Sequence, residues 1–148
     1  MFKKFLPQNP SAKNLAVFID GPNMLRREFH PDLLEIKKLL QPFGSIKIAK
    51  VFLNQFASQK LIEACTNQGF QVITTVSDID VAMAAHSTAA IFNPSISGIV
   101  LITRDADFVP VIQLAKEHGK ETIVVIEEEF SSSSLKHTAD QVIVLQKK

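Results

Sequence analysis

The chain has 148 residues, 46% of them apolar and 21% charged, which is the length and composition of one globular domain with a sizeable core. Its formal net charge of +1 excludes a strongly basic surface over the whole molecule, so any nucleic-acid contact must use a local patch. Cys65 is the only cysteine, which excludes an intrachain disulfide and a cysteine-rich zinc site.

The first residues differ from the rest of the chain. Residues 1–14 are polar and contain Pro7 and Pro10, so we expect an N-terminal tail followed by a single domain over residues 15–148. No stretch has the apolar run of a signal peptide or the length of a membrane span. Together with the lone thiol, this predicts a cytoplasmic protein with no membrane partner.

Six apolar segments along the chain predict β-strands. Several are nearly continuous runs of valine, isoleucine and leucine, which is typical of strands covered on both faces, as in a parallel sheet. The expected strands cover residues 15–19, 46–53, 71–74, 98–103, 122–126 and 141–145.

Helical patterns alternate with these strands. Gly69 and Gly119 are placed to end two helices, and Pro110 fits the first turn of a third pattern. The alternation predicts an α/β sheet with right-handed crossovers, in which ligands bind beyond the carboxyl ends of the strands. The expected helices cover residues 32–40, 58–69, 80–92, 108–119 and 131–139.

Acidic residues follow three of the expected strands. Asp20 ends the first strand in "LAVFIDGPNM", Asp78 and Asp80 follow the third in "SDIDVAMAAH", and Asp105 and Asp107 follow the fourth in "IVLITRDADFVPVI". Because the carboxyl ends of parallel strands lie at one edge of a sheet, these carboxylates are expected to converge.

Each acid also has a simpler interpretation. An aspartate before a helix is a common N-cap, which we favour for Asp78 and which explains Asp107 equally well, and "DGPN" at Asp20 is a strong turn sequence. Convergence favours a site instead, since clustered carboxylates repel one another unless a cation or a proton intervenes. Oxygen ligands suit Mg²⁺ or Mn²⁺, and such an ion activates water and shields the charge of a phosphodiester.

With these segments identified, the chain resembles the NYN domain family, a branch of the PIN-like nucleases. The pieces that carry the resemblance are "FIDGPNM", "DIDVAMAA", "LITRDADFVPVIQLAKEHGKETIVV" and "TADQVIVL", and the match as a whole covers about residues 15–145. The family more commonly has Ser-Gly-Asp-x-Asp-Phe where this chain has "RDADF", a form most similar to an archaeal branch.

The resemblance implies a PIN-like (Rossmannoid) three-layer α/β/α fold, whose mainly parallel sheet has the strand order 3-2-1-4-5. It also implies a divalent-metal ribonuclease. On the family's motif, Asn23 matches the polar residue of the first loop and Thr103 a small hydroxyl residue. The catalytic and metal-binding positions fall on Asp20, Asp80, Asp105 and Asp107, the aspartates that convergence already singles out.

One position departs from the family pattern. The family often has a second acid six residues after the aspartate of its alanine-rich helix, and here that residue is His86. Six helical residues rotate by about 240°, so Asp80 and His86 do not share a face of the helix. His86 is either a substrate contact or a surface residue, and the missing acid puts full catalytic strength in doubt.

Three arginines lie near the acids. Arg26 and Arg27 follow the first acidic loop and Arg104 sits inside the later motif, where each could grip an RNA phosphate or merely balance nearby acids.

The prediction is therefore a cytoplasmic ribonuclease that hydrolyses RNA phosphodiester bonds with Mg²⁺ or Mn²⁺, leaving a 5′-phosphate and a 3′-hydroxyl. The alternatives are a catalytically weak or inactive module that binds RNA or protein, which His86 and the near-neutral charge favour, and a different metal phosphatase. The RNA, the preferred metal, endo- or exonuclease action and the oligomeric state, with a homodimer among the alternatives, stay open. The expected substrate-binding residues are Asn23, Arg26, Arg27, Thr103 and Arg104.

Overall fold

The computed structural model describes residues 13–25, 33–127 and 133–145. In this part of the chain six strands form one sheet in the order β4-β3-β2-β5-β6-β7, and every neighbouring pair is parallel. The strands are β2 (Asn14–Asp20), β3 (Ser45–Asn54), β4 (Gln71–Thr75), β5 (Gly98–Ile102), β6 (Glu121–Glu127) and β7 (Gln141–Leu145). The expected α/β class, the strands and the order 3-2-1-4-5 are confirmed, and a further strand extends that order.

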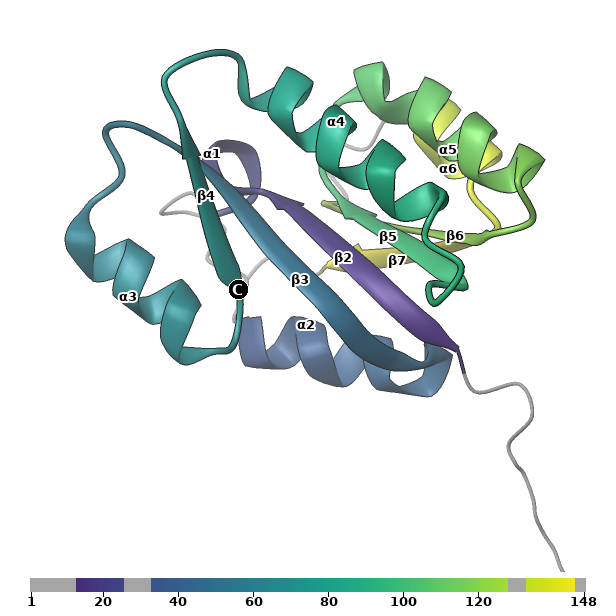
Figure 1. Cartoon of the computed structure of the whole chain (residues 1–148), viewed down its shortest axis with the longest axis horizontal. Helices are drawn as coiled ribbons and strands as arrows, with labels where there is room; N and C mark the ends of the chain where they lie inside the picture. Colours follow the sequence, from purple (N-terminus) through teal and green to yellow (C-terminus); the bar gives the residue numbers. More distant parts are fainter. Residues whose placement is uncertain (1–12, 26–32, 128–132, 146–148) are drawn as a thin grey trace, which may run out of the picture.

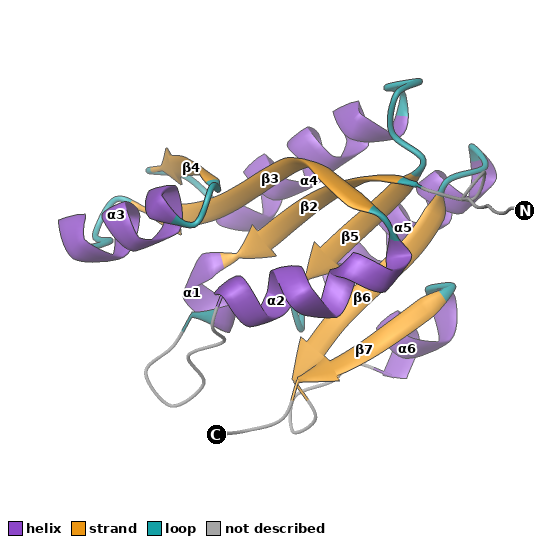
Figure 2. Ribbon diagram, turned by 90° about the horizontal axis from the view of Figure 1, so that it is seen from below, coloured by secondary structure: helices purple, strands orange, loops and turns teal. Residues whose placement is uncertain are grey.

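Helices cover both faces of the sheet, which gives three layers (Figure 1). Helices α2 and α3 pack on one face, while α4, α5 and α6 pack on the other (Figure 2). The bounds are α1 (Gly21–Met24), α2 (Leu33–Leu40), α3 (Gln59–Asn67), α4 (Ile79–Ile91), α5 (Val109–Glu117) and α6 (Ser133–Thr138), with 3-10 turns η3 (Gln41–Phe43) and η4 (Ala106–Phe108).

The apolar runs in the strands follow from this layering. In β2, Val17 and Ile19 belong to the core under α2 and α3, whereas Ala16 and Phe18 belong to the core under α4 and α5. All four are fully buried, because both faces of the strand are covered. Asp20 continues the alternation onto the α4 face, so the last residue of the strand carries its carboxylate toward that helix layer.

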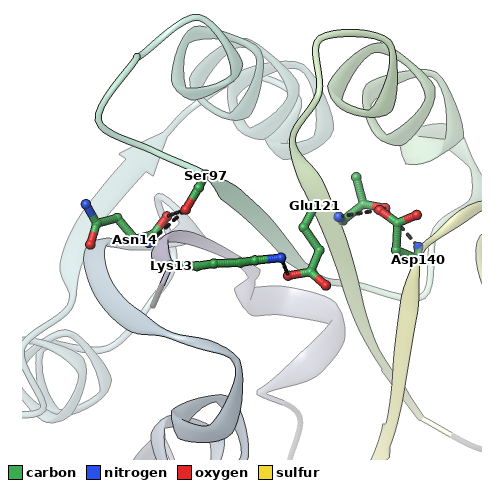
Figure 3. Close-up of polar contacts among 6 residues, drawn as sticks. Lys13, Asn14, Ser97, Glu121 and Asp140 are labelled. Atoms are coloured by element: carbon green, nitrogen blue, oxygen red, sulfur yellow. Dashed lines mark hydrogen bonds and ion pairs between the residues drawn. The ribbon is translucent and has the colours of Figure 1, made fainter. Parts of the chain in front are cut away.

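Polar contacts hold the strands together at the opposite, amino-terminal edge of the sheet (Figure 3). Lys13 pairs with Glu121 at 2.8 Å, and the backbone N–H of Asn14 donates to Ser97 Oγ at 2.9 Å. Asp140 Oδ2 accepts from both the backbone N–H and the hydroxyl of Thr122, at 2.9 and 3.0 Å. These contacts join the starts of β2, β5, β6 and β7, which stabilises the register that determines where their carboxyl ends lie.

Two glycines end helices where the sequence predicts it. Gly69 has a φ of 88° directly after the C-cap of α3, and the following N–H of Phe70 donates to Cys65 O at 3.1 Å. Gly119, with a φ of 78°, ends α5 in the same way.

The stretch after Asp20 is a single helical turn, α1, that lies directly on β3. Leu25 N–H donates to Gly21 O at 2.8 Å, which closes the turn. A Cβ atom on Gly21 would sit 2.5 Å from the carbonyl oxygen of Phe52 and 2.3 Å from Leu53 Cδ2. Only glycine lets the chain turn this tightly between Asp20 and the neighbouring strand.

We predict that Gly21→Ala lowers the free energy of unfolding by about 1–3 kcal/mol, because a backbone oxygen cannot move aside as a side chain can. Urea denaturation measures this. Gly98→Ala is the matched control, since its Cβ would meet chiefly Leu15 Cδ2, at 2.6 Å, and the nearest backbone atom is 3.8 Å away. A Gly21→Ala protein as stable as wild type, or less affected than Gly98→Ala, would contradict this account of the turn.

Some expectations lie outside the described residues, namely most of the N-terminal tail, Arg26, Arg27 and the start of the serine run at residues 131–132. None of the described helices is both long enough and apolar enough to cross a membrane.

Candidate metal centre

Three carboxylates meet at the carboxyl edge of the sheet. Asp80 lies in the first turn of α4, and Asp105 and Asp107 lie in the segment that follows β5. Each offers one oxygen, and these oxygens all lie within 4.8 Å of one another. Asp80 and Asp105 are half-buried and Asp107 is exposed, so the group is open to solvent on one side.

Two loops present these acids through the same local structure. Asp78 Oδ1 accepts the backbone N–H of Asp80 at 2.9 Å, and Asp105 Oδ1 accepts the backbone N–H of Asp107 at the same distance. In each Asp-x-Asp sequence the first acid therefore caps a helical turn, and the second projects from that turn toward the cluster. The cap interpretation is confirmed for Asp78. It is wrong for Asp107, because Asp105 caps η4 and α5 starts without a side-chain cap.

Asp20 connects to this group through a chain of hydrogen bonds. Thr103 donates its hydroxyl to Asp20 Oδ2 at 3.3 Å, and the same hydroxyl oxygen accepts the backbone N–H of Asp105 at 3.1 Å. Asp20 is only 1% exposed and Thr103 is fully buried. The tip of β2 thus orients the segment after β5, and Asp20 lies behind the three gathered carboxylates rather than among them.

The electrostatics of Asp80 show how crowded these charges are. The pKa of its carboxyl is raised from 3.8 to about 7, first by burial, then by a side-chain hydrogen bond with Asp105 and by the charges of Asp105, Asp20 and Asp78. Without a cation, the Asp80 carboxyl therefore keeps its proton up to about neutral pH, because burial and the neighbouring carboxylates both oppose its ionisation. The influence of Asp20 on this pKa places its charge close to the cluster.

The predicted substrate-binding residues are only partly described by the structure. Thr103 occupies the expected place, and its contacts are to Asp20 and Asp105. Arg104 is half-buried in the loop between Thr103 and Asp105. The backbone of Asn23 lies in α1, but its side chain is outside what the structure describes, as are Arg26 and Arg27.

His86 is half-buried, and its ring contacts residues of β3. Lys50 Nζ lies 2.9 Å from His86 Nδ1, and the imidazole packs edge-on against Phe52 with ring centroids 5.3 Å apart. Burial and the charge of Lys50 lower the pKa of His86, so the ring is neutral and accepts a hydrogen bond from the ammonium. Lys50 was not predicted, and its one signal in the sequence is a charge inside an expected strand, a feature that it shares with Lys47.

The parallel sheet, its strand order and the acidic cluster at its carboxyl edge define a nuclease-like α/β domain of the PIN kind. More specifically, the chain belongs to the NYN domain family, a PIN-like nuclease family, whose model matches residues 14–146.

Two other proteins are similar to this chain, one in sequence and one in fold. The chain is 52% identical over 129 residues to the uncharacterized protein MJ0482 of Methanocaldococcus jannaschii, a match covering 87% of the chain and 54% of that protein. The chain therefore spans about half the length of this curated relative. A solved structure, the protein of unknown function VPA0982 from Vibrio parahaemolyticus, shares the fold with a TM-score of 0.82 at 16% identity, covering 94% of this chain and 96% of that one.

The raised pKa of Asp80 makes the stability of the metal-free protein depend on pH. The unfolded chain releases this proton near pH 3.8 and the folded chain near pH 7, so stability falls as pH rises through this interval and the loss is complete above it. Asp80→Asn removes the effect. In EDTA, the melting temperature of Asp80→Asn minus that of wild type should increase from about pH 5 to about pH 8.5.

Glu63→Gln, an acid-to-amide change on the exposed surface of α3, is the control and should show no such trend. If the difference between Asp80→Asn and wild type is the same at both pH values, the carboxylates do not interact as described.

Proposed function

We propose that the protein is a ribonuclease that hydrolyses RNA phosphodiester bonds with Mg²⁺ or Mn²⁺. The observation that carries this proposal is the meeting of Asp80, Asp105 and Asp107 within 4.8 Å, at the edge of the sheet where α/β folds bind ligands. Membership of a PIN-like nuclease family supports the choice of a nucleic acid as substrate.

The residues present suit a hard divalent cation. All three gathered side chains offer carboxylate oxygens, which Mg²⁺ and Mn²⁺ prefer over nitrogen or sulfur ligands. The pKa of Asp80 is raised by burial and then by the neighbouring carboxylates, and a bound cation would offset both effects, with loss of the Asp80 proton. When bound, such an ion would lower the pKa of a water molecule and neutralise charge on the phosphodiester.

The chain's own residues would divide the remaining work. Asp80, Asp105 and Asp107 hold the ion, and Asp20 adds charge from behind and orients Asp105 through Thr103. Arg104 lies beside the cluster and is a candidate for contact with the RNA backbone, together with Asn23, Arg26 and Arg27 from the first loop.

The second candidate is a binding module of the same fold that holds RNA without cutting it. The observation in its favour is the contact between Lys50 and His86, because a family position that often carries an acid here carries an imidazole paired with a cation. That position cannot contribute negative charge to a metal site.

Divalent-ion binding is the first test. Adding Mn²⁺ should raise the melting temperature of wild type by mass action and raise that of Asp105→Asn far less. Asp78→Asn is the matched control, since asparagine caps a helix as well as aspartate does and Asp78 is not among the three gathered acids. An equal response in wild type and Asp105→Asn would show that the ion binds elsewhere.

Cleavage is the second test, with labelled single-stranded RNA, structured RNA and DNA in Mn²⁺, Mg²⁺ or EDTA. We expect Asp20→Asn and Asp105→Asn to lose at least about a hundredfold in rate, while RNA binding changes much less. His86→Asp should keep or raise activity, because it restores the acid common in the family. The nuclease proposal is wrong if the wild type binds RNA but cuts it with none of the divalent ions, and if His86→Asp is also inactive. The binding module would then be the better account.

A further inference from the structure

We infer that Lys50, held in place by His86, binds a phosphate of the RNA backbone next to the scissile one. This inference rests on the proposed function and adds to it a second contact with the substrate, outside the acidic cluster. We call the side chains of Lys50 and His86 the phosphate subsite.

Lys50 carries its charge inside the sheet. It pairs with Phe18 of β2 on one side and with Gln71 of β4 on the other, and it is half-buried. A charge that is partly removed from water is costly unless a group of opposite charge accompanies it. The ion pairs formed between described residues, Lys13–Glu121 and Lys116–Asp140, do not include Lys50.

The contact with His86 leaves the positive charge of Lys50 uncompensated. Lys50 Nζ lies 2.9 Å from His86 Nδ1, and burial and then the charge of Lys50 lower the pKa of His86, so the ring is neutral. A neutral imidazole accepts one hydrogen bond from the ammonium, which has three N–H donors. Phe52 packs against the imidazole and helps to hold it. An anion that approached Lys50 from solvent would meet an oriented ammonium with its full charge.

The phosphate subsite lies on the face of the sheet that carries the acids. Ile48 and Phe52, two residues before and after Lys50, both pack in the core under α4, so Lys50 points to the same face. Asp20 pairs in register with Phe52. Two strand residues span about 7 Å, so Lys50 leaves β3 about 7 Å back from the level of Asp20.

Helix α4 gives a second measure of the same separation. It begins at the carboxyl edge of the sheet and runs back over the strands (Figure 1). Asp80 and His86 are six residues apart, which is about 9 Å along the helix axis. Asp80 turns toward the acids that follow β5, whereas His86 turns toward β3. The acids and the phosphate subsite therefore flank the first half of α4.

A phosphate is the anion that this arrangement favours. The RNA backbone carries one negative charge on every nucleotide, so a strand with its scissile phosphate at the metal centre presents further phosphates close by. Lysine binds phosphate as a compact point charge. A cation at this place would also draw the backbone toward a site whose own residues are acidic.

A purely structural role for Lys50 makes a different prediction. The apolar stem of a lysine can cover neighbouring side chains while its ammonium stays in water. Lys50→Met keeps most of that stem and removes the charge. If Lys50 only covers the sheet, this substitution leaves RNA binding unchanged, whereas the phosphate subsite requires a loss.

The test measures binding of a short fluorescein-labelled single-stranded RNA to proteins that all carry Asp105→Asn, so that no cleavage intervenes. Lys50→Met should raise the Kd by about 3- to 10-fold. It should also make log Kd depend less steeply on the logarithm of salt concentration, by about 0.7, which corresponds to one lost phosphate contact on a single strand.

Lys47→Met is the matched control, because it removes the same charge from the same strand. Lys47 is exposed and lines a different hollow, together with Lys37 and Gln68. It should leave the Kd and the salt dependence close to those of the parent protein. An unchanged Kd in Lys50→Met, an equal change in Lys47→Met, or no measurable RNA binding overturns the inference.

His86→Asp tests the pair from its other member. A carboxylate at position 86 would form an ion pair with Lys50, so the Kd should rise about as much as in Lys50→Met. Combining the two substitutions should weaken binding no further than either alone, and additive losses would overturn the inference. The cleavage rate at saturating RNA is a separate quantity, which an acid at position 86 should keep or raise.

Cleavage by the protein with Asp105 intact separates substrate binding from the chemical step. Lys50→Met should raise KM and leave kcat unchanged, because Lys50 holds the strand and does not hold the ion. The rise in melting temperature on adding Mn²⁺ should equal that of wild type. A lower kcat or a weaker response to Mn²⁺ would place Lys50 in the metal centre and overturn the inference.

Failure of this inference is distinguishable from failure of the proposed function. A protein that never cuts RNA, but whose RNA binding depends on Lys50 and not on Lys47, retains the inference and loses the nuclease. A protein that cuts RNA with the same KM and the same Kd with or without the charge of Lys50 retains the nuclease and loses the inference.

Discussion

The parallel pairing of β2 with β5 is the constraint on which the site depends. Ile19 pairs with Ile102, so the next residues outward, Asp20 and Thr103, leave the sheet side by side and on the same face. Their hydrogen bond joins the tip of one strand to the loop that follows its neighbour. The hydroxyl oxygen of Thr103 also accepts the backbone N–H of Asp105, which fixes the position of Asp105. Because β2 is buried on both faces and clamped at its amino end, this pairing cannot slip without exposing the core.

The folded structure holds the carboxylates of Asp80 and Asp105 close together although their negative charges repel each other. Asp80 and Asp105 are kept close by two capped helical turns whose N–H groups favour negative charge, while burial and then the neighbouring carboxylates raise the pKa of Asp80. Strained electrostatics of this kind is common at functional sites, where a ligand or cation completes the balance. The proposed ion would thus stabilise the protein and carry its activity through the same contacts.

Much of this could be predicted from the sequence, because the signals were local. Continuous apolar runs predicted the buried strands, Gly69 and Gly119 predicted helix ends, and acids after strands predicted the cluster. What could not be predicted depends on distances between segments far apart in the chain. No local sequence pattern distinguishes Asp20, which lies behind the cluster, from Asp107, which belongs to it. Nor does any local pattern show that Lys50 of β3 contacts His86 of α4.

The most direct measurement is the anomalous diffraction of a crystal of the protein grown or soaked with Mn²⁺. The account predicts an anomalous peak within bonding distance of carboxylate oxygens of Asp80, Asp105 and Asp107, and no peak at this position in an Asp105→Asn crystal treated identically. A Mn²⁺-saturated crystal with no peak between these three side chains, or with the ion bound only at other surface acids, would contradict the central claim that the carboxyl edge of this sheet is a metal centre.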